Sequence, residues 1–163
     1  MKREININIS HAELIYDIDN KLHLIGRNQQ EENAVLAAHI QADEMPENRN
    51  FIIRKATEAI DTAKASMAHY IEDYSTAPDN TLNEEFPEGS TTFYLLMPSN
   101  FNMTLEATIA TLTHDFIVNY VCSEWLKMSA PKDAAVYAED AQKTLQALTD
   151  TLNSRVRPYR VLI

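Results

Sequence analysis

The stretch from Thr104 to Arg155 constrains the fold more than any other part of the sequence. Its apolar residues recur at steps of three and four, which is typical of helices that bury one stripe. Ser129-Ala130-Pro131 interrupts this pattern, because the residue before a proline is pushed out of the helical conformation. Pro131 can also open a second helix, since a first-turn position needs no backbone N–H. We therefore predict a helical hairpin over residues 103–155, with helices over about 103–128 and 132–155.

The two predicted helices differ in how they would be buried. The first is apolar on nearly two sides from Phe116 to Met128, so we expect this half to be the most buried part of the fold. The second has one seam, with small residues near Pro131 and leucines further on: Ala134, Ala138, Ala141, Leu145, Leu148 and Leu152. Such a seam fits a partner helix of the same chain, or a second copy in a homodimer.

Two short β-strands are predicted outside the hairpin. Ile5, Ile7 and Ile9 alternate with polar residues, and residues 91–97 are rich in strong β formers before Pro98. A lone strand leaves its backbone groups unpaired, so the simplest arrangement pairs these two strands with each other. The alternative is pairing in trans, with the sheet edge of a neighbouring subunit.

The region between the strands is predicted to be mainly helical. Residues 11–26 fit a helix with Ser10 as its cap and Gly26 at its end, although a strand remains an alternative for this stretch. A short helix over residues 31–43 is followed, after Pro46, by a long helix over about 48–74. The whole chain has only two glycines, which favours helices over sheets.

These elements predict one mainly α domain over residues 1–163: a helical bundle built on the C-terminal hairpin, with a minor two-stranded β element. Its parts in order are an N-terminal strand with short helices, a long helix, an acidic loop, a strand, the hairpin and a tail. Their ranges are 1–46, 47–75, 76–90, 91–98, 103–155 and 156–163.

Charge and cysteine content limit the possible partners and compartment. The net charge is −10, and residues 1–103 carry 17 acidic and 8 basic side chains. An acidic body argues against sequence-specific nucleic-acid binding, because affinity for nucleic acid rests on neutralising phosphates. The single cysteine, Cys122, lies on a predicted buried face and cannot form an internal disulfide. Without a signal peptide or a membrane-length apolar run, we expect a cytoplasmic protein that does not enter a membrane.

Candidate catalytic and metal groups are weak throughout the sequence. His69 with Glu72 and Asp73 is the one close group of histidine and carboxylates, and it is expected to lie on a solvated helix face. Two carboxylate pairs resemble the magnesium ligands of all-α nucleotide pyrophosphohydrolases, but Pro46 interrupts the first of them: Glu44 with Glu47, and Glu58 with Asp61. We expect an acidic surface here, no catalytic residues, no metal and no cofactor.

The C-terminal segment is the candidate partner-binding site. It combines arginines with a terminal apolar run, which suits a docking arm for a protein partner: Arg155, Arg157, Tyr159, Arg160, Val161, Leu162 and Ile163. The alternative is that this tail folds back on its own core. Arginines also suit the end of the preceding helix, because its dipole is negative there.

The order of these parts resembles small uncharacterised proteins of Bacteroidetes prophages that are encoded among virion structural genes. The best local match is Tyr16-Asp17-Ile18-Asp19-Asn20, together with the spacing of residues in the hairpin: Tyr120, Trp125, Leu145, Leu148, Leu152 and Arg155. More loosely, the chain is similar to the head–tail connector or adaptor proteins of tailed phages. That resemblance implies a small helical bundle with a minor β element and arms, forming a ring beneath the portal, without catalytic residues.

We therefore expect a non-enzymatic structural or interaction protein, most specifically a phage neck subunit. Its partners would be copies of itself in a ring and portal or tail proteins, with DNA nearby, and it would end in the virion. The second hypothesis is a regulatory or binding module that dimerises through the seam from Ala138 to Leu152. The third is the Mg²⁺-dependent pyrophosphohydrolase.

Overall fold

The computed structural model describes residues 2–29, 34–41, 46–71 and 89–156. Along the chain these form β1 (Arg3–Ser10), α1 (His11–Gln29), α2 (Ala34–Ile40), α3 (Pro46–Met67), β2 (Ser90–Met97), a short 3-10 turn at Met103–Leu105, α4 (Glu106–Leu126) and α5 (Pro131–Leu152). The fold is thus mainly α with a small antiparallel sheet, which confirms the predicted class. The acidic loop, apart from residues 89–90, and the tail after Val156 lie outside the described residues.

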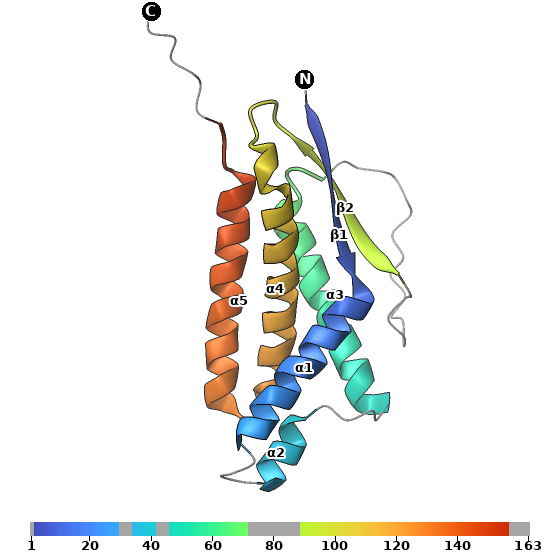
Figure 1. Cartoon of the computed structure of the whole chain (residues 1–163), viewed down its shortest axis with the longest axis vertical. Coiled ribbons are helices and arrows are strands. Elements are labelled where there is room, and N and C mark those ends of the chain that lie inside the picture. The colour runs from blue at the N-terminus through green and yellow to red at the C-terminus, as the bar shows by residue number, and fades with distance from the viewer. Residues whose placement is uncertain (1, 30–33, 42–45, 72–88, 157–163) are drawn as a thin grey trace, which may run out of the picture.

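α4 is the central element of the bundle. Figure 1 shows α4 and α5 side by side and antiparallel, with the sheet on the opposite side of α4. Its second half is buried on nearly every side, as predicted, while Met128 beyond its end is 96% exposed. A helix that packs against helices on one side and a sheet on the other needs apolar residues all round.

The predicted hairpin is confirmed, with a correction to its seam. Ala130 N–H donates to the Leu126 carbonyl at 2.8 Å, and α5 then begins at Pro131. Ala134, Ala141, Leu148 and Leu152 are buried, but Ala138 is exposed. Because Leu148 is 0% exposed and Leu152 1% within a single chain, the seam is intramolecular core and not a surface for a homodimer. The structure therefore does not support a dimer through this seam.

The two predicted strands pair with each other along their whole length. The register runs without a bulge from Arg3 opposite Met97 to Ser10 opposite Ser90. Ile5, Ile7 and Ile9 are buried together with Phe93, Leu95 and Met97, while the alternate side chains of β1 face outward. The alternation of apolar and polar residues in β1 therefore gives the sheet one apolar face, which packs on the helices.

α1 is a helix and not the alternative strand. Ser10 Oγ accepts from the Glu13 backbone N–H at 3.5 Å at its start, and its buried residues are His11, Leu14, Ile18, Leu22 and Gly26. The predicted end at Gly26 was wrong, because the helix continues to Gln29. Gly26 is instead a packing position: a Cβ there would lie 2.6 Å from Gln41 Cγ and 3.0 Å from the Ala37 carbonyl oxygen of the α2 segment.

We expect Gly26→Ala to destabilise the protein by about 1 kcal/mol, although the same change in an open helix stabilises by a similar amount. The added methyl group must displace the segment that carries α2. Urea unfolding measures the change. In the matched double variant, Gln41→Ala removes the closest contact and should recover part of the loss. A gain in stability for the single variant would contradict the close approach.

α3 ends earlier than predicted. The helix stops at Met67, and Tyr70 N–H closes a turn onto the Met67 carbonyl at 2.8 Å. The chain then runs along the sheet, where the Tyr70 carbonyl accepts from Leu96 N–H at 2.7 Å and Ile71 forms a bridge with Leu95. Helical periodicity persisted to Tyr70 in the sequence because Tyr70 is itself buried, at 8% exposure. Its burial comes from the bundle end and not from a further helical turn.

Candidate protein-interaction surface

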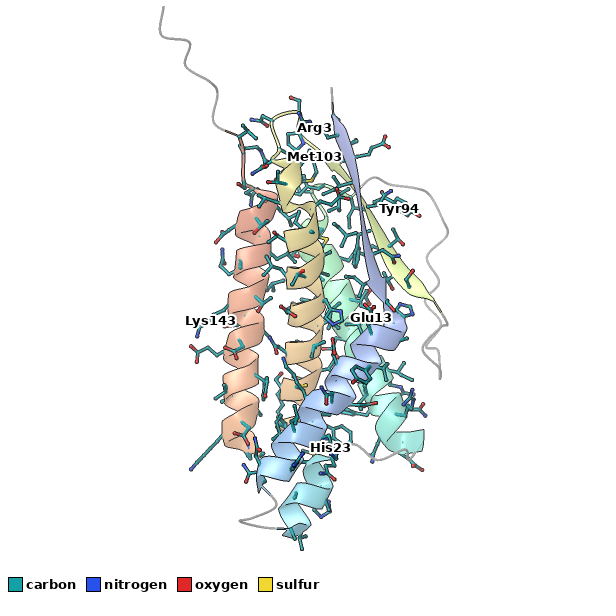
Figure 2. The ribbon with its side chains drawn as sticks, in the orientation of Figure 1. Arg3, Glu13, His23, Tyr94, Met103 and Lys143 are labelled. Atoms are coloured by element: carbon teal, nitrogen blue, oxygen red, sulfur yellow. The ribbon has the colours of Figure 1, made fainter. Side chains whose placement is uncertain are left out.

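An open groove of about 630 Å³ lies where β1 passes into α1, beside the first half of α4. The end of β1, the first two turns of α1 and one face of α4 line it: Asn8, Ile9, Ser10, Ala12, Glu13, Tyr16, Asp17, Ala110, Thr111 and His114. In Figure 2, Glu13 marks the start of α1 at this place and Arg3 marks the far end of β1. The groove combines small apolar walls with a carboxylate rim, which suits protein side chains that carry positive charge.

A polar contact fixes the two helices that form the groove. His114 Nε2 of α4 lies 2.7 Å from Asp17 Oδ2 of α1, and the Asp17 side chain remains 47% exposed. Tyr16 beside it is 69% exposed, which is high for a large aromatic residue. Tyr16 and Asp17 begin the segment that carried the phage resemblance. This segment therefore provides part of the groove surface.

The two edges of the sheet differ in how far other backbone segments cover them. On the β2 side, Leu96 N–H is already bonded to Tyr70, so this edge is partly covered. On the β1 side, no strand among the described residues pairs with β1 apart from β2. Within the described residues, the backbone thus covers one edge of the sheet and leaves the other without a strand beside it.

The alternation of backbone hydrogen bonds along the pair shows which β1 residues direct their N–H and C=O groups away from β2. Leu96 points its N–H away from β1, and His11 N–H donates across the pair to the Gly89 carbonyl at 3.1 Å. In an antiparallel ladder, residues alternate between bonding the partner strand and facing away from it. With Leu96 opposite Glu4, the outward-facing residues are Glu4, Asn6 and Asn8. Their backbone donors and acceptors have no backbone partner within the described chain.

This edge lacks the usual protection against pairing. Native sheets blunt exposed edges with proline, bulges, short strands or charges in the middle of the strand. β1 has eight residues in regular register and no proline, and residues 5–10 carry no charge. An unprotected edge of this kind is a template for a further strand.

Arg155 is the one predicted partner-binding residue that lies within the described part of the chain. Its side chain is half-buried and bonded to other residues of the molecule. Its Nη1 donates to the Leu152 and Ser154 carbonyls, both at 2.9 Å, and its Nη2 donates to Tyr70 Oη at 3.0 Å. Tyr70 Oη in turn donates to Asn153 Oδ1 at 2.7 Å. Arg155 therefore caps the end of α5 and ties it to the turn that follows α3. The other predicted residues lie outside the described part: Arg157, Tyr159, Arg160, Val161, Leu162 and Ile163.

The carboxylates considered for magnesium occupy a surface already rich in ion pairs. Glu58 accepts from Lys55 Nζ at 2.7 Å and from Tyr120 Oη at 2.5 Å. The Lys55 contact, followed by the Tyr120 bond, lowers the pKa of the Glu58 carboxyl, while burial and Glu58 raise the pKa of the Tyr120 hydroxyl. Glu47 and Asp61 are exposed, and Glu44 lies outside the described residues, as do Glu72 and Asp73 beside His69.

In residues 2–29, 34–41, 46–71 and 89–156, no group of three or more histidine, cysteine or carboxylate side chains is placed to hold a metal ion. Within the same ranges, no helix combines the length and the apolar character needed to cross a membrane.

Cys122 is buried at 0% exposure, as predicted, and burial raises the pKa of its thiol to about 12. At pH 8 only about one thiol in ten thousand would then be ionised, and the thiolate is the reactive form. We expect thiol reagents to label the folded protein at least about 100-fold more slowly than the protein in urea. Equal rates in the two conditions would show that the thiol is accessible in the folded state.

Sequence reasoning missed the groove and found the free edge only as an alternative. The alternation of Ile5, Ile7 and Ile9 with polar residues predicted a strand but carries no sign of which edge stays open. The groove joins residues about 100 positions apart, such as Asp17 and His114, and no local pattern signals that contact.

Comparison with known proteins found no match, whether with family models, curated proteins or solved structures.

Proposed function

We propose that this chain is a non-enzymatic structural protein that acts by binding other protein subunits. The observation that carries the proposal is the free edge of β1 beside an open groove, on a body whose helical seam is already used internally. A strand edge binds through backbone hydrogen bonds, and an adjoining groove adds side-chain selectivity. Both features serve protein partners better than they serve small molecules.

The specific role that we propose is a head–tail connector, or neck and adaptor, subunit of a tailed phage. The order of elements and the segment at Tyr16–Asn20 support this role through the resemblance described above. Its partners would be neighbouring copies in a ring and portal or tail proteins, with no membrane and no cofactor. The net charge of −10 suits a part that lies near DNA without holding its phosphates. The protein would be made in the cytoplasm and end in the virion.

A homodimeric regulatory or binding module is the second candidate. The seam from Ala138 to Leu152 cannot carry such a dimer, because Leu148 and Leu152 are buried in the single chain. The free β1 edge favours self-association by another route and keeps this candidate open.

The mass in solution, measured by light scattering over a wide concentration range with negative-stain images of the same fractions, tests both candidates. We expect assemblies larger than 18.6 kDa, and a closed ring would support the connector role. A dimer without higher assemblies would support the second candidate. A monomer at every concentration that also fails to bind a portal-type protein would contradict both.

A further inference from the structure

We propose that the free edge of β1 binds β1 of a second copy of this chain, so that two sheets join antiparallel into one four-stranded sheet across a two-fold axis. The inference goes beyond the connector role and does not depend on it. It rests on the outward backbone groups of Glu4, Asn6 and Asn8 and on the sequence of β1 itself.

A second copy fits this edge because β1 is complementary to itself. A two-fold axis at Asn6 places Glu4 opposite Asn8 of the second copy and Asn6 opposite its counterpart. These are the residues whose donors and acceptors face outward, so the backbone bonds between the copies form without any change in β1. No like charges stand opposite each other on this face, whereas an axis at Glu4 would oppose two carboxylates.

The same register continues the apolar face. Ile5 of one copy lies opposite Ile7 of the other, on the side of the sheet that the helices cover. With the axis at Asn6, residues 3–9 of the two β1 strands overlap, and Ser10 of each copy comes opposite Lys2, which directly precedes the strand. An axis at Ile5 shortens the overlap to residues 3–7, whereas an axis at Ile7 overlaps residues 4–10 and places Asn6 opposite Asn8, so that the cross-linking of Asn6→Cys distinguishes it from the axis at Asn6.

Charge complementarity supports the choice of occupant. In this register Lys2 of the second copy lies opposite Ser10, next to the groove whose rim carries Glu13 and Asp17. Lys2 is exposed, and the Asp17 side chain is 47% exposed. The two-fold axis repeats this attraction, so the basic end of each β1 meets the acidic start of the other α1. The open groove leaves room for the incoming residues there.

A disulfide trap tests the register. We expect Asn6→Cys to form a covalent dimer under mild oxidation, because Cα atoms opposite each other in a hydrogen-bonded antiparallel pair are about 5.5 Å apart, within disulfide range. The matched control is Asn8→Cys, which is equally exposed but falls opposite Glu4 and should remain at least about tenfold less cross-linked. Cys122 does not interfere, because it is buried. Equal cross-linking of both variants, or of neither, would overturn the proposal.

A backbone test provides a second measurement. Asn6→Pro removes an outward-facing N–H and should raise the dimer dissociation constant at least about tenfold, since two symmetric bonds are lost. Asn6→Ala keeps the N–H and should leave the constant within about threefold of the wild type. Circular dichroism of dilute samples checks that both variants fold. If Asn6→Ala and Asn6→Pro weaken the dimer equally, or if the wild type is a monomer at every concentration, the β1 contact is refuted.

These outcomes are separate from those of the connector proposal. A ring whose Asn6→Cys variant does not cross-link would refute the β1 contact and leave the connector role standing. A cross-linked dimer that builds no larger assembly would establish the contact and count against the ring.

Discussion

Leu148→Asp is expected to abolish the folded state or to lower the free energy of unfolding by more than about 4 kcal/mol. Leu148 is 0% exposed on α5, where it packs in the seam against α4. A carboxylate there would lose its hydration without gaining a partner, and the leucine's packing would be lost as well. Since single domains are stable by about 5–15 kcal/mol, one such change removes a large share of the total.

Ala138→Asp provides the matched control for Leu148→Asp. It introduces the same charge on the same helix, at a seam position that the structure leaves exposed. We expect a cost of about 0.5 kcal/mol, from the lower helix propensity of aspartate. Urea unfolding at equal protein concentration measures both variants. If Leu148→Asp stays folded and only changes the oligomeric mass, the seam lies between copies and the assignment of α5 to the core is wrong.

Trp125→Ala is expected to lower the free energy of unfolding by about 3 kcal/mol. The indole Nε1 of Trp125 donates to the Ile40 carbonyl at 2.7 Å, and its ring meets Phe51 edge-on with centroids 5.7 Å apart. One side chain of α4 thus holds the end of α2 and the start of α3. α2 has only seven residues, and a helix of this length does not persist in water without such contacts.

Trp125→Phe separates the two contributions of the indole. It keeps an aromatic ring against Phe51 and removes the donor to the Ile40 carbonyl. We therefore expect it to lower the free energy of unfolding by about 1 kcal/mol, less than Trp125→Ala does. Amide hydrogen exchange gives the location: protection within Ala34–Ile40 should fall in Trp125→Ala well before the rest of the bundle opens. Unchanged exchange in α2 would show that α1 alone holds it.

The largest elements followed from local sequence patterns. Steps of three and four, with Pro131 as a break, predicted the hairpin, because a helix needs one continuous apolar stripe and proline cannot sit in its middle. Alternation in β1 predicted a strand and its buried face for the same kind of reason. These features depend on residues a few positions apart, where the geometry of the backbone fixes which side chains share a face.

Element ends were less predictable, because tertiary contacts decide them. Gly26 was expected to end α1, since glycine commonly adopts the left-handed conformation after a helix. Here it is the position where the α2 segment approaches too closely for a side chain. α3 was expected to run to residue 74, but Tyr70 turns away to pair with Leu96. In both cases a contact with another segment decides the outcome: it takes the space for a side chain at Gly26 and a backbone hydrogen bond at Tyr70. No local sequence pattern signals such a contact.

The sequence by itself determined the class of this protein: a mainly helical bundle on a C-terminal hairpin, with one short sheet and a buried thiol. Only the tertiary structure decided which surfaces remain for partners. In the described part of the chain, the α5 seam is buried, Arg155 is held against Tyr70, and one edge of β1 has no strand beside it next to the groove. The physical reason is that burial depends on the sum of contacts from the whole chain, whereas periodicity shows only that a face is apolar. An apolar face is the same in sequence whether its own chain or a second copy covers it.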